Sequence, residues 1–148
     1  MFCFGTYGLL FLKKQESRVC SVNCLSVTEA PDGSGGIISV DFQHILFLKC
    51  NTSESQSILV QTRESVYYIM GPLRYWVSAL NSTGCHFSIV NRGTAVNIDN
   101  VSRLDRAFKA AYFNLRNGPN SLTCTIAYHR YRFVEKELIT INPNIIMC

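Results

Sequence analysis

The sequence lacks the residue patterns that most enzymes need. It has no glycine-rich phosphate-binding loop and no nucleophile elbow, and its aspartates form no paired-carboxylate pattern. Cys85 and His86 cannot act as a nucleophile and its base, because adjacent residues of a strand point to opposite faces. We therefore expect a protein that is not an enzyme, with no catalytic residue and no cofactor.

Charged residues are scarce as well. They make up 16% of the chain beside 47% hydrophobic residues, which excludes a disordered chain and predicts a folded globule. A length of 148 residues suits a single domain that can bury a core. The net charge of +4 is compatible with a polyanion as partner, but it is also common among proteins that bind none.

A Cys-x-x-Cys pair is missing, although the chain has seven cysteines. Without that spacing, and with three scattered histidines, we expect no metal site. The cysteines and the sequons at Asn51, Asn81 and Asn100 leave open a secreted, disulfide-stapled protein-interaction domain. However, no basic residue precedes the apolar run 2–12, as it would in a secretory signal, and the run is too short to span a bilayer. A cytoplasmic protein with no membrane partner is the preferred expectation.

Proline and glycine divide the chain near its start. Residues 30–36 read Ala-Pro-Asp-Gly-Ser-Gly-Gly, which is typical of a linker. We predict an N-terminal arm, residues 1–31, and one domain, residues 32–148. Strands are predicted from Ile37 to Cys50, with a bend near His44, and as an antiparallel return over 57–61.

Two helices are predicted next. The first would begin after Thr62, which can cap it, and end before Gly71. The second would begin at Pro72 and run through Leu80, because proline is favoured at the first helical position. Trp76, the only tryptophan, lies in the second helix and is expected in the core or at an interface rather than against a ligand.

The stretch from Asn81 to Asn117 has the clearest pattern in the chain. Alternation predicts strands over 85–90 and 94–98, joined by a hairpin turn at 91–93 in which Asn and Gly tolerate positive φ. A helix is predicted after Asp99 and Asn100, and it should end at Asn117. Its apolar stripe would consist of Leu104, Phe108, Ala111 and Leu115.

The C-terminal part predicts another hairpin. Residues 122–134 alternate as a strand, 135–137 would turn, and 138–141 would return. The predicted fold class is therefore α+β, an antiparallel sheet packed on one side by two or three helices. Arg130 and Arg132 would share one face of the strand, with aromatic residues on the other. That interleaving is found in single-stranded nucleic-acid binders, but it equally fits an exposed charged face over an aromatic core.

The strands over 85–98 predict a face of small and polar groups. His86, Ser88, Ala95 and Asn97 would lie on it. Such a face can contact the 2′-hydroxyl groups of an A-form duplex, or it can simply be a solvated sheet face. Four basic residues near it could contact phosphates: Lys49, Arg63, Arg74 and Arg92.

Three blocks of the chain resemble the RNA-silencing suppressors of tombusviruses and aureusviruses, which sequester double-stranded RNA. The first is Asp32-Gly33-Ser34-Gly35-Gly36-Ile37, and the second is Thr62-x-Glu64-Ser65-Val66-x-Tyr68. The third reads Asn81-x-x-Gly84-Cys85-x-Phe87-Ser88-Ile89-x-x-Arg92-Gly93-x-x-Val96-x-Ile98, followed by Ser102-Arg103.

The resemblance implies a viral protein of the host cytoplasm that binds small interfering RNA on a concave sheet, independently of sequence. It implies a homodimer whose sheet continues across the two-fold axis. RNA contacts would come from Lys49, Gly84, His86 and Ser88, near Asp99. The interface between the two copies would include Thr94, Val96, Ile98, Arg103 and Phe108. Because no tryptophan lies between Gly36 and Phe47, we expect weak dependence on duplex length.

Overall fold

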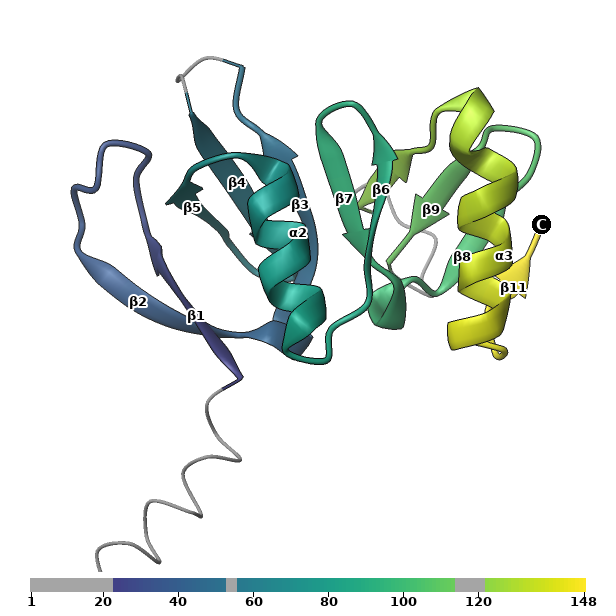
Figure 1. The fold of residues 1–148 in the computed structure, drawn as a ribbon, viewed down its shortest axis with the longest axis horizontal. Coiled ribbons are helices and arrows are strands. Elements are labelled where there is room, and N and C mark those ends of the chain that lie inside the picture. The colour runs from purple at the N-terminus through teal and green to yellow at the C-terminus, as the bar shows by residue number, and fades with distance from the viewer. Residues whose placement is uncertain (1–22, 53–55, 114–121) are drawn as a thin grey trace, which may run out of the picture.

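The computed structural model describes residues 23–52, 56–113 and 122–148, which form two β-sheets and two α-helices (Figure 1). The larger sheet is antiparallel throughout, in the order β2-β1-β5-β4-β3-β7-β6. Its strands are β1 (Cys24–Thr28), β2 (Ile37–Asp41), β3 (Ile45–Cys50), β4 (Ser57–Thr62), β5 (Val66–Met70), β6 (Phe87–Asn91) and β7 (Thr94–Asn97).

The smaller sheet has the order β10-β9-β8-β11, and its last pair is parallel. Its strands are β8 (Arg103–Asp105), β9 (Ala110–Tyr112), β10 (Thr123–Thr125) and β11 (Ile146–Met147). The α-helices are α2 (Leu73–Ser82) and α3 (Tyr131–Ile141), and the short 3-10 helices are η1 (Phe42–His44), η2 (Ile98–Asn100) and η3 (Tyr128–Arg130). None of the described helices is long and apolar enough to cross a membrane.

The larger sheet lies between two hydrophobic cores. Adjacent residues of a strand point to opposite faces, so Leu48 packs in one core and Phe47 in the other. The first core is closed by α2, through Leu73, Val77 and Leu80. The second is closed by the smaller sheet and by α3, which contributes Tyr131, Val134 and Leu138. The two α-helices therefore cover opposite faces of the larger sheet.

Several predicted elements are confirmed. The strand pattern over 37–50 forms β2 and β3, with η1 as the bend near His44. β4 is the antiparallel return strand, and β6 and β7 form the predicted hairpin. α2 forms where the second helix was predicted, although it begins at Leu73, with Pro72 as the residue before it and not as its first residue. Trp76 is half-buried against the α2 core, and its indole Nε1 donates to the carbonyl oxygen of Met70 at 2.7 Å.

The predicted α+β class, one sheet with helices on one side, is wrong. The described residues are dominated by antiparallel sheet, and the two short α-helices among them lie on different faces of the larger sheet. The error comes from three segments whose secondary structure was misassigned.

The segment after Thr62 is a strand, β5, not a helix. Thr62 does form hydrogen bonds of the capping type, but they close the turn between β4 and β5 and do not start a helix. The Thr62 hydroxyl oxygen accepts from the backbone N–H of Ser65 at 3.0 Å, and the N–H of Thr62 donates to the carbonyl of Ser65 at 2.9 Å. Beyond the turn, the run Val66-Tyr67-Tyr68-Ile69 is β-branched and aromatic, which favours a strand.

The helix predicted after Asn100 is absent from the described residues; β8 and β9 stand there instead. Leu104 and Ala111 are paired directly across the two strands of this hairpin, and both are fully buried in the second core. Phe108, a member of the predicted helical stripe, is 76% exposed in the turn between them. The helical spacing was therefore coincidental, and the predicted end of that helix, 114–117, lies outside the described residues.

At the C-terminal end the error is the reverse, because a helix forms where a hairpin of two strands was predicted. Only β10 forms there, and 131–141 is the helix α3 rather than a strand, a turn and a return strand. The spacing of Tyr131, Val134 and Leu138 is that of one helical face, and these three residues are buried. The arginine–aromatic alternation just before them obscured that spacing.

The predicted division into an arm, 1–31, and a domain, 32–148, stays a prediction. β1 comes from the range assigned to the arm, and it pairs with both β2 and β5 in the larger sheet. Residues 1–22 lie outside the described part of the chain.

Four cysteines of the described residues are free thiols: Cys50, Cys85, Cys124 and Cys148. Cys124 is 6% exposed, and burial raises the pKa of its thiol to about 12, although Lys49 acts in the other direction. The thiolate is the nucleophile, so this thiol should be inert in the folded protein.

We expect iodoacetamide to alkylate Cys124 at least about 100-fold more slowly than the exposed Cys148 under native conditions. Peptide mapping by mass spectrometry measures each site separately. In denaturant the two rates should converge, which provides the internal control. Similar rates in the native protein would show that the second core is open to reagent.

Candidate nucleic-acid interface

Six basic residues gather along one edge of the molecule, which we call the basic edge. They are Lys49 at the end of β3, Arg92 between β6 and β7, Arg106 and Lys109 between β8 and β9, Arg130 in η3, and Arg132 in the first turn of α3. The β6–β7 turn and the first turn of α3 lie at the top of Figure 1. Residues far apart in sequence thus meet at one edge.

Three backbone hydrogen bonds hold these segments side by side. The N–H of Cys50 donates to the carbonyl of Gly93 at 2.7 Å, joining the end of β3 to the β6–β7 turn. The N–H of Ala127 donates to the carbonyl of Val90 at 2.8 Å, and that of Ile126 to Lys109 at 2.7 Å. The strand ends and η3 therefore form one continuous border.

Arg92 lies at the tip of the β6–β7 hairpin. The turn is held by the side chain of Asn91, whose Oδ1 accepts from the N–H of Gly93 at 3.1 Å and whose Nδ2 donates to the carbonyl of Thr125 at 2.8 Å. No residue of this turn has positive φ, so the expected left-handed conformation is absent. Arg92 is exposed, and its side chain makes no hydrogen bond or ion pair with any described residue.

Other cations of the basic edge are fixed in place. Arg130 donates from Nε to the carbonyl of Ile89 at 3.1 Å, and its guanidinium lies 5.0 Å from the ring centroid of Phe133. The Nζ of Lys109 donates to the carbonyl of Arg106 at 3.2 Å and lies 4.4 Å from the ring centroid of Tyr131. Such cation–π contacts hold a charged side chain in one orientation.

Two carboxylates also lie near the basic edge, and both are engaged. Asp105 accepts from the backbone N–H groups of Ala107 and Phe108 at 2.9 and 3.0 Å, which closes the β8–β9 turn. Glu135 accepts from Nε of Arg106 at 2.8 Å, and this bond raises the pKa of the Arg106 guanidinium.

Burial, followed by the Glu135 carboxylate, raises the pKa of Tyr131 to about 12, so its hydroxyl stays protonated. A cavity of about 480 Å³ lies between these groups and is lined by Lys109, Tyr128, His129 and Arg132 among others. Among the described residues, six cations lie on this edge against these two carboxylates, so their balance is positive.

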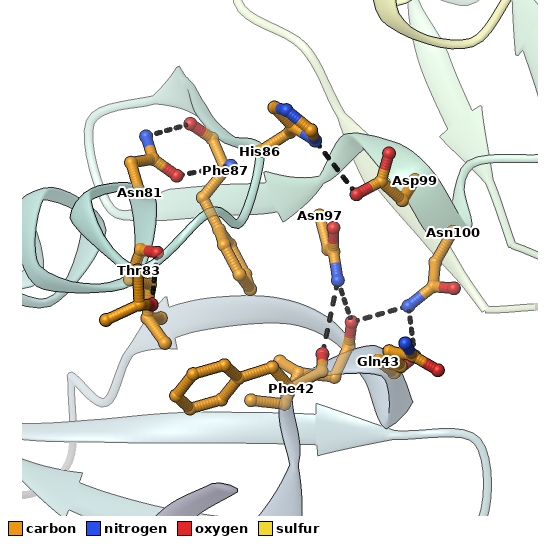
Figure 2. Close-up of polar contacts among 11 residues, drawn as sticks. Phe42, Gln43, Asn81, Thr83, His86, Phe87, Asn97, Asp99 and Asn100 are labelled. Atoms are coloured by element: carbon orange, nitrogen blue, oxygen red, sulfur yellow. Dashed lines mark hydrogen bonds and ion pairs between the residues drawn. The ribbon is translucent and has the colours of Figure 1, made fainter. Parts of the chain in front are cut away.

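The other end of the same strands carries the opposite charge. Asp41 caps η1, Glu64 lies in the β4–β5 turn, and Asp99 lies in η2, where it faces Nδ1 of His86 at 3.0 Å (Figure 2). Among the described turns at this end, Arg63 is the only lysine or arginine. Its guanidinium donates to the carbonyl of Phe113 at 3.0 Å. We call this end the acidic edge.

The structure divides the residues predicted to bind RNA. Lys49 and Arg92 are on the basic edge, and Arg74 is exposed in the first turn of α2. Arg63, Gly84 and His86 are on the acidic edge.

Ser88 and Asn97 are each only 4% exposed, and the Ser88 hydroxyl donates to the carboxylate of Glu137 on α3. The polar sheet face proposed to meet RNA is thus covered by the chain itself.

The interface expected between two copies is also not available. β7 is paired with β3 on one side and β6 on the other, so it has no open edge. Thr94, Val96 and Ile98 are buried inside the monomer, at 6%, 0% and 1% exposure. Arg103 lies over the ring of Tyr112 at 3.9 Å, and Phe108 is exposed on the basic edge.

Comparison with known proteins gives a single family. The family model described as the LytTr DNA-binding domain matches residues 35–138, which is most of the chain. The chain belongs to the LytTR family. It is also similar to a solved structure, the LytTr DNA-binding domain of a putative methyl-accepting/DNA response regulator from Bacillus cereus, with a TM-score of 0.59 at 14% identity. That likeness covers 78% of this chain and 96% of the Bacillus chain. No curated protein sequence matches.

The LytTR assignment overturns the resemblance to tombusvirus and aureusvirus suppressors. The first two quoted blocks are short, and the third covers the end of α2, the hairpin of β6 and β7, and η2. It also overturns what the resemblance implied: a viral origin, suppression of RNA silencing, sequestration of double-stranded RNA and a homodimeric sheet. The described residues contain no cluster of three or more His, Cys, Asp or Glu side chains placed to hold a metal ion.

Sequence reasoning missed two residues of the basic edge, Arg106 and Lys109, because their neighbours were assigned to a helix that does not form. Lys49 and Arg92 were predicted as phosphate contacts, and the alternation of Arg130 and Arg132 with aromatic residues was noticed. Only the fold shows that these arginines lie beside Arg92.

Proposed function

We propose that this chain binds double-stranded DNA through the basic edge, as the DNA-binding module of a gene regulator. The observation that carries the proposal is the separation of charge between the basic edge and the acidic edge in a chain of the LytTR family. The Bacillus protein with the similar domain is described as a DNA response regulator, which suggests the regulatory context. That the chain is not an enzyme, and that it works in the cytoplasm, stay part of the proposal.

The two kinds of cation on the basic edge suit two kinds of contact. Lys109 and Arg130 are held by carbonyl groups and aromatic rings, so they can meet phosphates without losing much side-chain freedom. Phosphate contacts position a protein on the duplex but carry no sequence information. We assign Lys49, Arg132 and these two residues to that role.

Arg92 is the residue placed to read bases. The major groove of B-form DNA, about 12 Å wide, admits a two-stranded β-ribbon, and β6–β7 is such a ribbon with Arg92 at its tip. A free guanidinium there can bond to O6 and N7 of a guanine together. The deep, narrow major groove of an RNA duplex would exclude the same hairpin.

The charge separation predicts a strong dependence of binding on salt. For a short DNA duplex of arbitrary sequence we expect a Kd in the range of about 1–100 μM near physiological salt. Four phosphate contacts, from Lys49, Lys109, Arg130 and Arg132, give a slope of log K against log salt of roughly −3 to −4. Fluorescence anisotropy over a salt series measures both quantities.

An RNA duplex of the same sequence is the matched control, and it should bind more weakly because its groove is closed to the hairpin. Binding that ignores salt, or that is equally tight to both duplexes, would contradict the proposal.

A further inference from the structure

The basic edge displays two aromatic side chains to solvent. Phe108, in the turn between β8 and β9, is 76% exposed, and Tyr128, in η3, is 84% exposed. They flank Lys109, which follows Phe108 in the chain and whose Nζ lies 5.3 Å from the ring centroid of Tyr128. Among the described large hydrophobic residues only Ile37 is as exposed, and it lies in β2, at the other end of the larger sheet. Large apolar side chains gathered at one place on a surface indicate a contact with a partner.

The turn that carries Phe108 is held in one conformation. The carboxylate of Asp105 accepts from the backbone N–H groups of Ala107 and Phe108 at 2.9 and 3.0 Å. Lys109 has φ of +50°, a left-handed conformation that residues other than glycine rarely adopt. Its carbonyl oxygen is nevertheless fixed, because it accepts from the N–H of Ile126 at 2.7 Å. Backbone strain of this kind concentrates at functional sites.

Phe108 lies close enough to Arg92 for both side chains to enter one groove of a DNA duplex. Residues 126–127 run between the β6–β7 hairpin and the β8–β9 turn. Their backbone N–H groups donate to the carbonyls of Lys109 at 2.7 Å and Val90 at 2.8 Å. Extended segments joined in this way lie about 4.8 Å apart, so Val90 and Lys109 are separated by roughly 10 Å. The major groove of B-form DNA is about 12 Å wide.

The chemistry of a phenyl ring limits what Phe108 can recognise. The ring has no hydrogen-bond donor or acceptor, so contact is favourable only where it removes apolar surface from water. In the major groove, the apolar group that marks one base is the C5-methyl group of thymine, and phenylalanine is among the side chains that pack against it. Phosphates and the polar edges of the other bases offer no comparable partner.

We propose that Phe108 packs against the C5-methyl group of a thymine in the major groove that Arg92 enters, as a second specificity-determining residue. This inference rests on the proposed binding of DNA through the basic edge, and it adds a thymine to the guanine assigned to Arg92. The phosphate contact of Lys109 positions the turn on the duplex, and the ring beside it then lies over the base edges.

Replacing thymine with deoxyuridine tests the proposal, because the change removes only the methyl group. The duplex is the sequence that the unchanged protein selects from a random library, and each of its thymines is replaced in turn. Fluorescence anisotropy gives the affinity for each duplex. We expect at least one position at which deoxyuridine weakens binding about fourfold, the effect of exposing one buried methyl group.

Three variants are measured on the same set of duplexes. Phe108→Ala keeps the backbone N–H that bonds to Asp105, so its turn stays closed, and it should be insensitive to deoxyuridine at that position. Phe108→Leu keeps an apolar side chain and should retain part of the sensitivity. Ile37→Ala removes a side chain of similar exposure outside the basic edge and should behave as the unchanged protein does.

The possible results separate this inference from the proposed function. If the unchanged protein binds the selected duplex but no thymine responds to replacement, Phe108 does not read a methyl group. The same conclusion follows if Phe108→Ala keeps the full sensitivity, or if Ile37→Ala loses it equally. In these cases binding of DNA through the basic edge still stands. If the protein binds no duplex at all, the proposed function fails and takes this inference with it.

Discussion

Replacing Arg92 with alanine should reduce affinity for a selected DNA sequence by roughly 10- to 100-fold. The guanidinium at the hairpin tip is exposed and makes no hydrogen bond or ion pair with described residues, so the change should remove a base contact and leave the fold intact. The preferred sequence is first obtained by selection from a random duplex library. Anisotropy then gives the affinity of each variant for the selected duplex and for a scrambled one.

Arg132→Ala is the matched comparison on the same edge. Its guanidinium is assigned to a phosphate, so its loss should weaken binding to both duplexes by a similar factor. Arg92→Ala should weaken mainly the selected duplex and so relax specificity. If Arg92→Ala binds the selected duplex as tightly as the unchanged protein, the hairpin does not read bases.

Replacing Leu138 with alanine should lower the free energy of unfolding by about 2–5 kcal/mol. Leu138 is fully buried in the second core, where α3 closes the space between the two sheets. Removing most of this side chain leaves a cavity that rigid sheets cannot fill by collapse. Urea denaturation followed by circular dichroism measures the change.

Ile139→Ala is the natural control, since the next residue on the same helix is 47% exposed. It should change the free energy of unfolding by no more than about 0.5 kcal/mol. Equal effects of the two substitutions would mean that α3 is not anchored by its buried face. Because α3 follows η3 directly, Leu138→Ala should also weaken DNA binding as the helix loosens.

Sequence patterns predicted the central part of the larger sheet well. Alternation from Ile37 to Cys50 and across the β6–β7 hairpin corresponds to residues that are buried on one face and then the other. α2 was predictable because Pro72 directly precedes it and a single apolar face runs along it. In these elements the local preference and the tertiary environment agree.

The rest of the fold was not predictable because short strands carry little periodicity. β8 and β9 have three residues each, so Leu104 and Ala111 could be fitted to a helical stripe as easily as to a hairpin. α3 was hidden because its first turn continues an alternating basic and aromatic run. Ser88 and Asn97 were predicted to share one polar face, but they lie on opposite faces of the larger sheet and both are buried. Tertiary packing alone decides that burial.

The separation of charge between the two edges has a consequence for how fast the domain finds DNA. With positive charge on the basic edge and negative charge on the acidic edge, the part of the molecule around β3, β6 and β7 carries an electric dipole along these strands. A polyanion exerts a torque on such a dipole and turns it before contact, so that collisions through the acidic edge are rejected. The effect acts over the Debye length, about 8 Å at physiological ionic strength, so the association rate should fall steeply as salt is added.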